Sequence, residues 1–233
     1  MVGLVIDIET TSRYPTISEQ TGYLRDDCEI LEVGYLRVDT ITKEILSHGV
    51  LYFYKPYFRV ESEAQQIHGL TRSFLEQYEK DFEKNLITLT ALIQKTLLIG
   101  KNTEGFDIKF IDRFIDKHSK GILKLENTVN KQRIKTYDGR NFFYDNASWS
   151  QDMQVIFPIT FRQLYYDKYK EVLPKNRKGK LGEYIDVLNA REEVDRIYAS
   201  LTKDRETGAH GALYDVVMTY VVWLECDKRN LLD

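Results

Sequence analysis

The first strand candidate is the feature that most restricts how this chain can fold. Leu4–Ile8 is a short, apolar, β-rich run that is typical of a buried strand. Asp7 and Glu9 stand at its carboxyl end, and the two-residue period of a strand places both side chains on one face. Such a pair is often a solvent-facing strand end, or is paired with Arg or Lys. The apolar run favours a central strand instead, whose carboxyl end is where open α/β sheets bind ligands.

The elements that follow predict an α/β fold with one mixed sheet. Two strand candidates, Ile30–Val38 and Leu46–Tyr54, are joined by short polar connections, which is typical of an antiparallel meander. Two later strands, Leu97–Gly100 and Val155–Phe157, alternate with helices. This order predicts a mixed five-stranded sheet flanked by helices. The expected helices are Ser62–Ile67, Ser73–Glu83, Leu86–Gln94, Ile108–Lys117, Phe161–Tyr169, Leu181–Val187, Ala190–Leu201 and Ala212–Lys228.

Nothing in the composition requires a second domain, so we expect a single domain over residues 1–233. The least regular part is Gly121–Asp152. Within it, Ile134–Tyr144 resembles a β-hairpin around Asp138-Gly139, a dipeptide suited to a tight primed turn. We therefore expect a β-hairpin insertion near residues 130–147.

Bulk properties exclude some classes of protein. The formal net charge is −3, which argues against a protein that coats duplexes by electrostatics alone, but permits an acidic site with a local basic rim. Cys28 and Cys226 fit no metal or redox spacing and are expected to be reduced thiols. No apolar run approaches the ~20 residues of a membrane span, and the amino terminus lacks the features of a signal peptide. We therefore expect a cytoplasmic protein without membrane contact.

Two further acids stand where elements can converge on the same sheet edge. Asp107 follows a strand and a glycine-containing turn at the start of a helix, where it could also be a simple helix cap. Asp215 lies within the apolar periodicity of the last helix, and a buried acid there needs a metal or a basic partner. Four such carboxylates offer the oxygen ligands that two Mg²⁺ or Mn²⁺ ions prefer.

His210 precedes Asp215 by five residues, a spacing that puts the two side chains on different faces of one helix. If both serve one site, His210 must lie on the loop ahead of the helix, where Gly208 and Gly211 supply conformational freedom. A histidine with a pKa near neutrality suits the activation of water, although a lone loop histidine is often merely exposed.

Taken together along the chain, these acids, the histidine and the residues around them resemble the motifs of the DEDDh (DnaQ-like) 3′→5′ exonucleases. The resemblance rests on Asp7-Ile8-Glu9-Thr10-Thr11, on Asn102 through Phe106-Asp107, and on His210-x-Ala212-x-x-Asp215. Gln66-Ile67-His68-Gly69-Leu70-Thr71 also looks like an element of the proofreading branch, and Lys180-Leu181-Gly182-Glu183-Tyr184 resembles a helix start ahead of the third motif. The motifs run from residue 7 to about residue 223, nearly the whole chain.

The resemblance implies a ribonuclease-H-like fold and a role for each matched residue. Asp7 would bridge two metal ions, Glu9 and Asp215 would complete the shell of the first ion, and Asp107 would support the second ion through water. His210 would be the general base. The residues expected to contact the substrate are Thr10, His68, Asn102 and Phe106; for His68 a structural role in a turn is an equal alternative.

Three departures from the family pattern bear on substrate preference and leave the ligands and the base intact. Ser12 replaces a frequent glycine, Lys101 replaces a frequent histidine, and the spacing from Asn102 to Asp107 is one residue longer than in many members.

Two basic stretches could contact nucleic acid. The first mixes basic and aromatic residues in the expected hairpin, which suits a single strand, although the aromatics could equally pack on the protein body. We expect the second to hold the phosphates upstream of the cut. The first contains Lys131, Arg133, Lys135, Tyr137, Arg140, Phe142, Phe143 and Tyr144; the second contains Lys168, Lys170, Lys175, Arg177, Lys178 and Lys180.

The leading hypothesis is therefore a Mg²⁺- or Mn²⁺-dependent 3′→5′ exonuclease that releases nucleoside 5′-monophosphates, preferably from single-stranded DNA. Within the enzyme class, the alternative is an RNA-trimming exonuclease of the ribonuclease T or oligoribonuclease kind. From another class, the alternative is an inactive nucleic-acid-binding module, which is expected to have lost one of the five motif residues. Replication or repair proteins are conceivable partners, but no tail motif indicates one.

Overall fold

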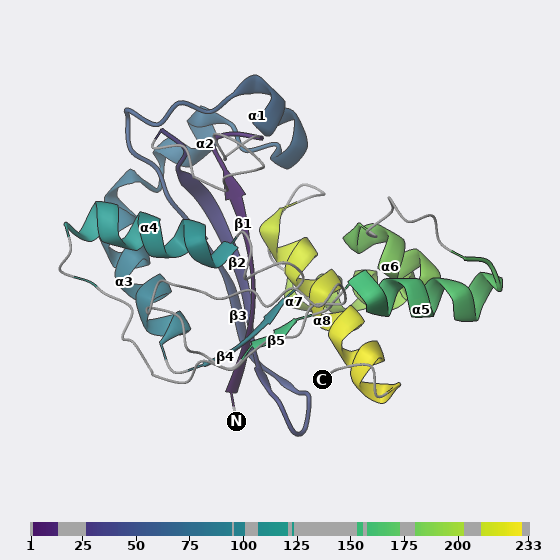
Figure 1. Cartoon of the computed structure of the whole chain (residues 1–233). Helices are drawn as coiled ribbons and strands as arrows, with labels where there is room; N and C mark the ends of the chain where they lie inside the picture. Colours follow the sequence, from purple (N-terminus) through teal and green to yellow (C-terminus); the bar gives the residue numbers. More distant parts are fainter. Residues whose placement is uncertain are drawn as a thin grey trace.

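The structure is a computed structural model, and it describes residues 2–13, 27–94, 96–100, 107–120, 123, 153–155, 158–172, 180–202 and 211–229. One mixed sheet organises the fold, with strand order β3-β2-β1-β4-β5 (Figure 1). β1 pairs antiparallel with β2, which pairs antiparallel with β3, while β1–β4 and β4–β5 are parallel. The strands are β1 (Val2–Thr10), β2 (Ile30–Asp39), β3 (Ile45–Tyr52), β4 (Leu97–Gly100) and β5 (Met153–Val155). The expected α/β class with a mixed sheet flanked by helices is confirmed.

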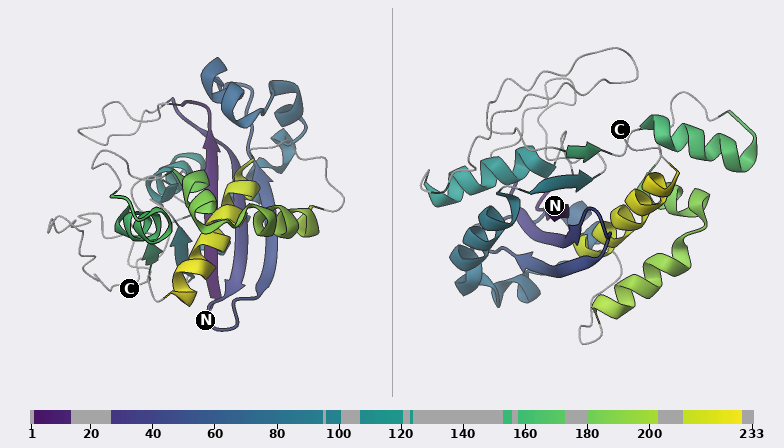
Figure 2. Two further views of the ribbon diagram at one scale, coloured as in Figure 1. Left: turned by 90° about the vertical axis from the view of Figure 1, so that its right-hand side faces the viewer. Right: turned by 90° about the horizontal axis from the view of Figure 1, so that it is seen from below.

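Helices cover both faces of this sheet (Figure 2). α3 and α4 lie on one face, and α8 lies on the other with α6 and α7 outside it. The helices are α1 (Ser62–His68), α2 (Arg72–Glu76), the 3-10 turn η1 (Glu79–Asp81), α3 (Phe82–Ile93), α4 (Asp107–Ser119), α5 (Pro158–Tyr169), α6 (Leu181–Leu188), α7 (Arg191–Leu201) and α8 (Ala212–Lys228). Among the described residues, no helix is long and apolar enough to cross a membrane.

Side-chain alternation along β1 separates two apolar cores. Leu4, Ile6 and Ile8 point to the core beneath α3 and α4, whereas Val5 points to the core beneath α8. Because alternate residues of a strand share a face, Asp7 and Glu9 extend the row of Val5 onto the α8 side. β1 therefore directs its two acids toward the last helix of the chain.

The expected helix Ser73–Glu83 was wrong. The chain instead forms the short helix α2, a turn, η1 and then α3, which starts at Phe82. Thr71 is the N-cap of α2, because its hydroxyl accepts the Phe74 N–H, whereas Ser73 lies inside the helix. α3 begins earlier than expected because Phe82 extends the apolar row of that helix into the core.

Smaller shifts occur at other boundaries. β3 ends at Tyr52 instead of Tyr54, and α4 begins with Asp107 itself instead of Ile108. β5 starts two residues before the expected strand, and α5 begins at Pro158 instead of Phe161. The hairpin expected near 130–147 lies outside the described residues, and the single-domain organisation stays a prediction. Both cysteines are buried and free.

Candidate active site

Three carboxylates from opposite ends of the chain meet on the α8 side of the sheet. Asp7 and Glu9 come from the carboxyl end of β1, and Asp215 comes from the first turn of α8. One carboxylate oxygen from each lies within 4.8 Å of the others, and all three side chains are partly buried. Distances of this size allow the three side chains to share a divalent cation.

Asp107 borders this cluster from the first position of α4 and is buried. Its carboxylate accepts a hydrogen bond from the backbone N–H of Ile8, the residue between Asp7 and Glu9 on β1. Its charge also contributes to raising the pKa of Asp7. Asp107 is therefore hydrogen-bonded to the strand end that carries the first two acids. It starts a helix and lies beside the carboxylate cluster at the same time.

Burial and mutual repulsion make it unfavourable for all carboxylates of the cluster to be ionised at once. The pKa of Asp7 is raised well above its usual range by burial and then by the charges of Asp107, Asp215, Glu9 and Glu32. Burial, followed by the charges of Glu32, Asp215 and Asp107, raises the pKa of Glu9 to about 8. Burial likewise raises the pKa of Asp107 to about 8. A group of buried carboxylates in this state is stabilised by bound cations, and an all-oxygen donor set fits Mg²⁺ or Mn²⁺.

Glu32 is a fifth acid of the site that the sequence reasoning missed. It lies on β2 directly opposite Glu9, is 3% exposed, and its Oε2 atom has no hydrogen-bond partner among the described residues. Burial and the charge of Asp215 raise its pKa to about 7, although a hydrogen bond from the Ala212 backbone works against them. The available signal was an acid that interrupts the apolar run Ile30–Val33, as Asp7 and Glu9 interrupt theirs.

The close approach of α8 depends on two glycines. A Cβ atom at Gly34 of β2 would lie 2.5 Å from the Ala212 and Leu213 backbone. At Gly211, the residue before α8, a Cβ atom would lie 3.1 Å from Glu32 Oε1. The absence of both side chains lets the first turn of α8, which carries Asp215, rest directly on β2.

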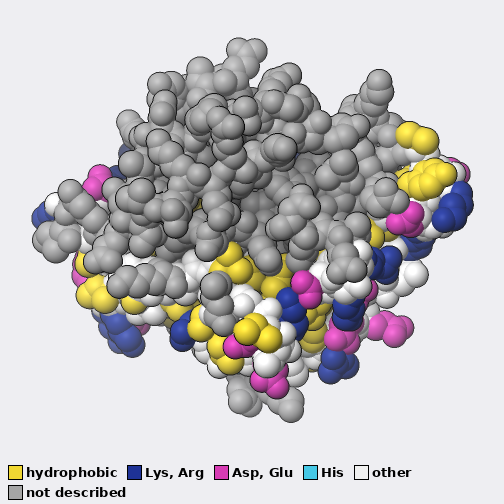
Figure 3. Space-filling view, turned by 60° about the horizontal axis from the view of Figure 1, so that its bottom comes forward, with side chains coloured by type: hydrophobic (Ala, Val, Ile, Leu, Met, Phe, Trp, Pro, Cys, Tyr) yellow, Lys and Arg dark blue, Asp and Glu magenta, His cyan; other side chains and the backbone are white. Residues whose placement is uncertain are grey.

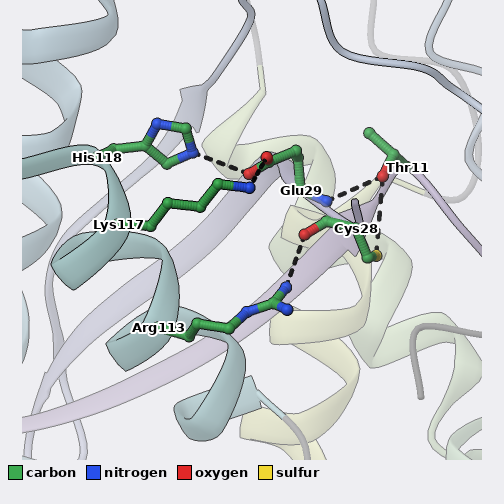
Figure 4. A network of polar contacts seen from close by, with 6 residues as sticks. All are labelled: Thr11, Cys28, Glu29, Arg113, Lys117 and His118. Atoms are coloured by element: carbon green, nitrogen blue, oxygen red, sulfur yellow. Dashed lines mark hydrogen bonds and ion pairs between the residues drawn. The ribbon is translucent and has the colours of Figure 1, made fainter. Parts of the chain in front are cut away.

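A polar network holds the far end of α4 against the segments that flank the site (Figure 4). The Glu29 carboxylate is buried and pairs with Lys117 and with His118 Nε2, the latter at 2.8 Å. Arg113 donates to the Cys28 carbonyl at 2.7 Å. These contacts join α4 to the chain just before β2.

Thr11, two residues after Glu9, completes this network. Its hydroxyl oxygen accepts the Glu29 N–H at 2.9 Å, and the hydroxyl donates to Cys28 Sγ at 3.7 Å. The network therefore connects the end of β1, the start of β2 and the helix that begins with Asp107.

The expected substrate-contact residues are only partly described. Thr10 is buried, and its hydroxyl donates to the Ser12 carbonyl at 2.8 Å, within the turn that follows β1. His68 is buried, and its Nδ1 accepts the Leu70 N–H at 3.0 Å, a contact within the turn that follows α1. Its contact with substrate stays a prediction. Burial lowers the pKa of His68, against the effect of the Thr10 backbone. Asn102, Phe106 and His210 lie outside the described residues.

The comparisons with known proteins agree with this geometry. A sequence model of the exonuclease family (RNase_T) matches residues 4–163, more than half of the chain. The chain belongs to the DEDDh exonuclease family. No curated protein sequence matches it.

Solved structures of several exonucleases share the fold of this family member. Escherichia coli exonuclease I in complex with a dT13 oligonucleotide superposes with a TM-score of 0.60 at 14% identity, covering 98% of this chain and 41% of that one. Cell-death related nuclease 4 gives 0.52 at 15% identity, with 99% and 65% covered. A 3′-exonuclease that recognises the histone mRNA stem-loop gives 0.50 at 14% identity, with 99% and 83% covered. The chain thus spans less than half the length of exonuclease I.

The second basic stretch is only partly described, and its described lysines differ in their contacts. Lys168 Nζ donates to the Asp186 carbonyl and to Asn189 Oδ1, the latter at 2.7 Å, so this lysine ties α5 to the end of α6. Lys170 and Lys180 are exposed, whereas Lys175, Arg177 and Lys178, like the basic hairpin, lie outside the described residues. On the face shown in Figure 3, the described basic and acidic side chains are interspersed.

Proposed function

We propose that this protein is a 3′→5′ exonuclease that hydrolyses the terminal phosphodiester bond of single-stranded DNA and releases nucleoside 5′-monophosphates. The observation that carries the proposal is the convergence of Asp7, Glu9 and Asp215, with Asp107 bound to the same strand end. Family membership supports the reaction class. An inactive binding module has no evident need for several buried, mutually repelling carboxylates.

Asp7, Glu9 and Asp215 are the residues that would hold divalent cations, with Asp107 beside them. When bound, two such ions lower the pKa of water, neutralise the scissile phosphate and stabilise the leaving 3′-oxygen. The chain itself supplies the positioning: β1 fixes two carboxylates on one face, and α8 brings the third against them. The cluster is partly buried, which limits competing solvent around the ligands.

His210 is the proposed general base, which would take the proton from the attacking water. The described part of the chain resumes at Gly211, and α8 starts at Ala212, so His210 precedes the helix that carries Asp215. We expect His210→Ala to lower kcat by roughly 10²–10⁴-fold, the usual contribution of general base catalysis. Metal affinity should stay within about twofold. His48→Ala, on β3, is the matched control and should keep full activity.

The preference for single-stranded DNA rests on the resemblance of Gln66–Thr71 to the proofreading branch. RNA trimming is the second candidate, because the solved neighbours include both an enzyme bound to a DNA oligonucleotide and one that recognises an RNA stem-loop. A direct comparison of matched DNA and RNA strands separates the two.

The test is a time course on matched DNA and RNA oligonucleotides, labelled at the 5′ end, with Mg²⁺, Mn²⁺ or EDTA. A ladder that shortens from the 3′ end and is abolished by EDTA is expected, with DNA degraded faster. Asp7→Asn should abolish it, whereas the matched control Asp39→Asn, at the opposite end of the β1–β2 pair, should not. Binding without shortening would identify a binding module, and full activity of Asp7→Asn would overturn the metal assignment.

A further inference from the structure

Glu32 lies at a position where a carboxylate lowers the stability of the fold. It faces Glu9 directly across the antiparallel β1–β2 pair, and like charges in that arrangement destabilise a sheet. It is almost fully buried, and Oε2 has no hydrogen-bond partner among the described residues. A buried oxygen of this kind normally has a partner, so its environment requires an explanation.

The other part of the Glu32 carboxylate has a defined partner at the start of α8. It accepts the backbone N–H of Ala212, the first residue of that helix. The N-cap residue, Gly211, has no side chain to perform this task. Because the first N–H groups of a helix lack partners within the helix, Glu32 supplies from a neighbouring strand an acceptor for the first of them.

This contact controls the placement of a site residue. Asp215 lies in the same first turn, three residues after Ala212. Gly34, two residues after Glu32 and on the same strand face, contacts the backbone of that turn. β2 therefore holds the turn in two ways, by backbone contact at Gly34 and by a hydrogen bond from Ala212 to Glu32.

We propose that Glu32 is a positioning residue for Asp215: it holds the first turn of α8 against β2 as a hydrogen-bond acceptor, and so sets the distance of Asp215 from Asp7 and Glu9. This inference rests on the proposed function, because it assigns Glu32 to the same metal-binding site. Residues that orient metal ligands typically change metal affinity by about 10–100-fold when they are removed.

The experiment compares Glu32→Gln and Glu32→Ala in the full chain. Glutamine keeps an oxygen acceptor and loses the charge, whereas alanine loses both. Mn²⁺ binding is measured by calorimetry after EDTA treatment, and amide hydrogen exchange of residues 212–215 is measured without metal. Tyr220→Phe is the matched control, since it removes the hydrogen bond from α8 to the Lys43 carbonyl, which belongs to the hairpin between β2 and β3.

We expect Glu32→Ala to bind Mn²⁺ at least about 10-fold more weakly and to exchange the first-turn amides roughly fivefold faster or more. Glu32→Gln should stay within about threefold of the wild type in both measurements, which is close to the variation expected for a retained acceptor. Tyr220→Phe should leave both unchanged. Wild-type exchange in Glu32→Ala overturns the proposal, and a Glu32→Gln variant as impaired as Glu32→Ala shows that charge, not positioning, is responsible.

Failure of the proposed function has a different signature. If the wild type binds no Mn²⁺, or Asp7→Asn binds it equally well, the metal assignment is wrong. The exchange of α8 in metal-free protein then still decides whether Glu32 holds the helix, because that measurement needs no bound ion.

Discussion

At the scale of single residues, the buried carboxylates of the site lower the free energy of unfolding of the metal-free protein. Glu9 has its pKa raised to about 8 by burial and by neighbouring acids, so its ionised form is unfavourable in the folded state. The same physics applies to Asp7, whose pKa is raised for similar reasons. Removal of one such charge should therefore stabilise the protein when no cation is bound.

We expect Glu9→Gln to raise Tm of the metal-free protein at pH 8 by several degrees, since relief of about 1 kcal/mol corresponds to roughly 2–4 °C at this size. The gain should vanish near pH 4, where the wild-type side chain is protonated. Thermal unfolding in EDTA measures both. The exposed control Glu63→Gln should show no gain, and a lower Tm for Glu9→Gln at pH 8 would contradict the argument.

Glu29 is the opposite case. Burial would raise its pKa, but hydrogen bonds from His118 and Lys117 and their charges outweigh burial and lower it. A lowered pKa contributes stability above the unfolded value and loses it as the pH falls through the folded value. Glu29→Gln should therefore cost about 2 kcal/mol at pH 7, and much less near pH 3. Denaturant unfolding at both pH values checks this, and equal stability at pH 7 would refute it.

The positions of single residues could be predicted most directly where the geometry of one strand decides them, whereas their roles in the site stay predictions. The shared face of Asp7 and Glu9 follows from strand geometry alone, and the structure places Asp215 beside them. Glu32 was missed because its importance depends on register: it faces Glu9 only because β2 pairs with β1 in one alignment, which no local pattern determines. The catalytic role of His210 stays a prediction.

At the scale of elements, the contact between β2 and α8 is the most sensitive to volume. A methyl group at Gly34 would meet backbone atoms, which cannot move aside as a flexible side chain would. The helix must shift, and Asp215 shifts with it.

We expect Gly34→Ala to lower stability by about 1–3 kcal/mol and to weaken Mn²⁺ binding about 10-fold or more. Gly182→Ala is a matched control that should raise stability instead of lowering it. The nearest atom to its Cβ would lie 3.8 Å away, and alanine is favoured inside helix α6. Thermal unfolding and calorimetry measure both. Unchanged Mn²⁺ affinity in Gly34→Ala would show that α8 tolerates displacement.

Element boundaries show where local sequence is insufficient. The run Ser73–Glu83 has helical composition, yet the chain divides it into α2, η1 and the start of α3. Leu75, on α2, and Phe82, at the start of α3, both reach the core beneath α3 and α4. Their seven-residue spacing would also place them on one face of a single helix, so the apolar pattern does not reveal the break. Propensity alone is a weak guide at such a junction.

At the scale of the whole molecule, the mixed sheet flanked by helices could be anticipated, because three antiparallel strands followed by strand–helix alternation allow few sheets. The short strand β5 was misplaced by two residues, since three residues carry little periodic signal. The position of the carboxylate cluster could therefore be predicted better from the sheet than from any single motif.

The raised pKa values link global stability to pH and to metal. Glu9, Glu32 and Asp107 have pKa values of about 8, 7 and 8 in the folded state, above their usual values. Between those usual values and about pH 8, the folded protein binds more protons than the unfolded chain, so stability falls as pH rises. We expect Tm in EDTA to decrease from pH 5 to pH 8, and saturating Mn²⁺ to cancel most of that loss. A Tm in EDTA that rises over this range would contradict the linkage.

The meeting of β1 with α8 also has a consequence for biosynthesis. Asp7 leaves the ribosome 208 residues before Asp215 does. A nascent chain that still lacks α8 has no third carboxylate and cannot assemble the cation site. We therefore expect the proposed nuclease to stay inert while the residues between β1 and α8 are synthesised, and to become active only after α8 has docked on the sheet.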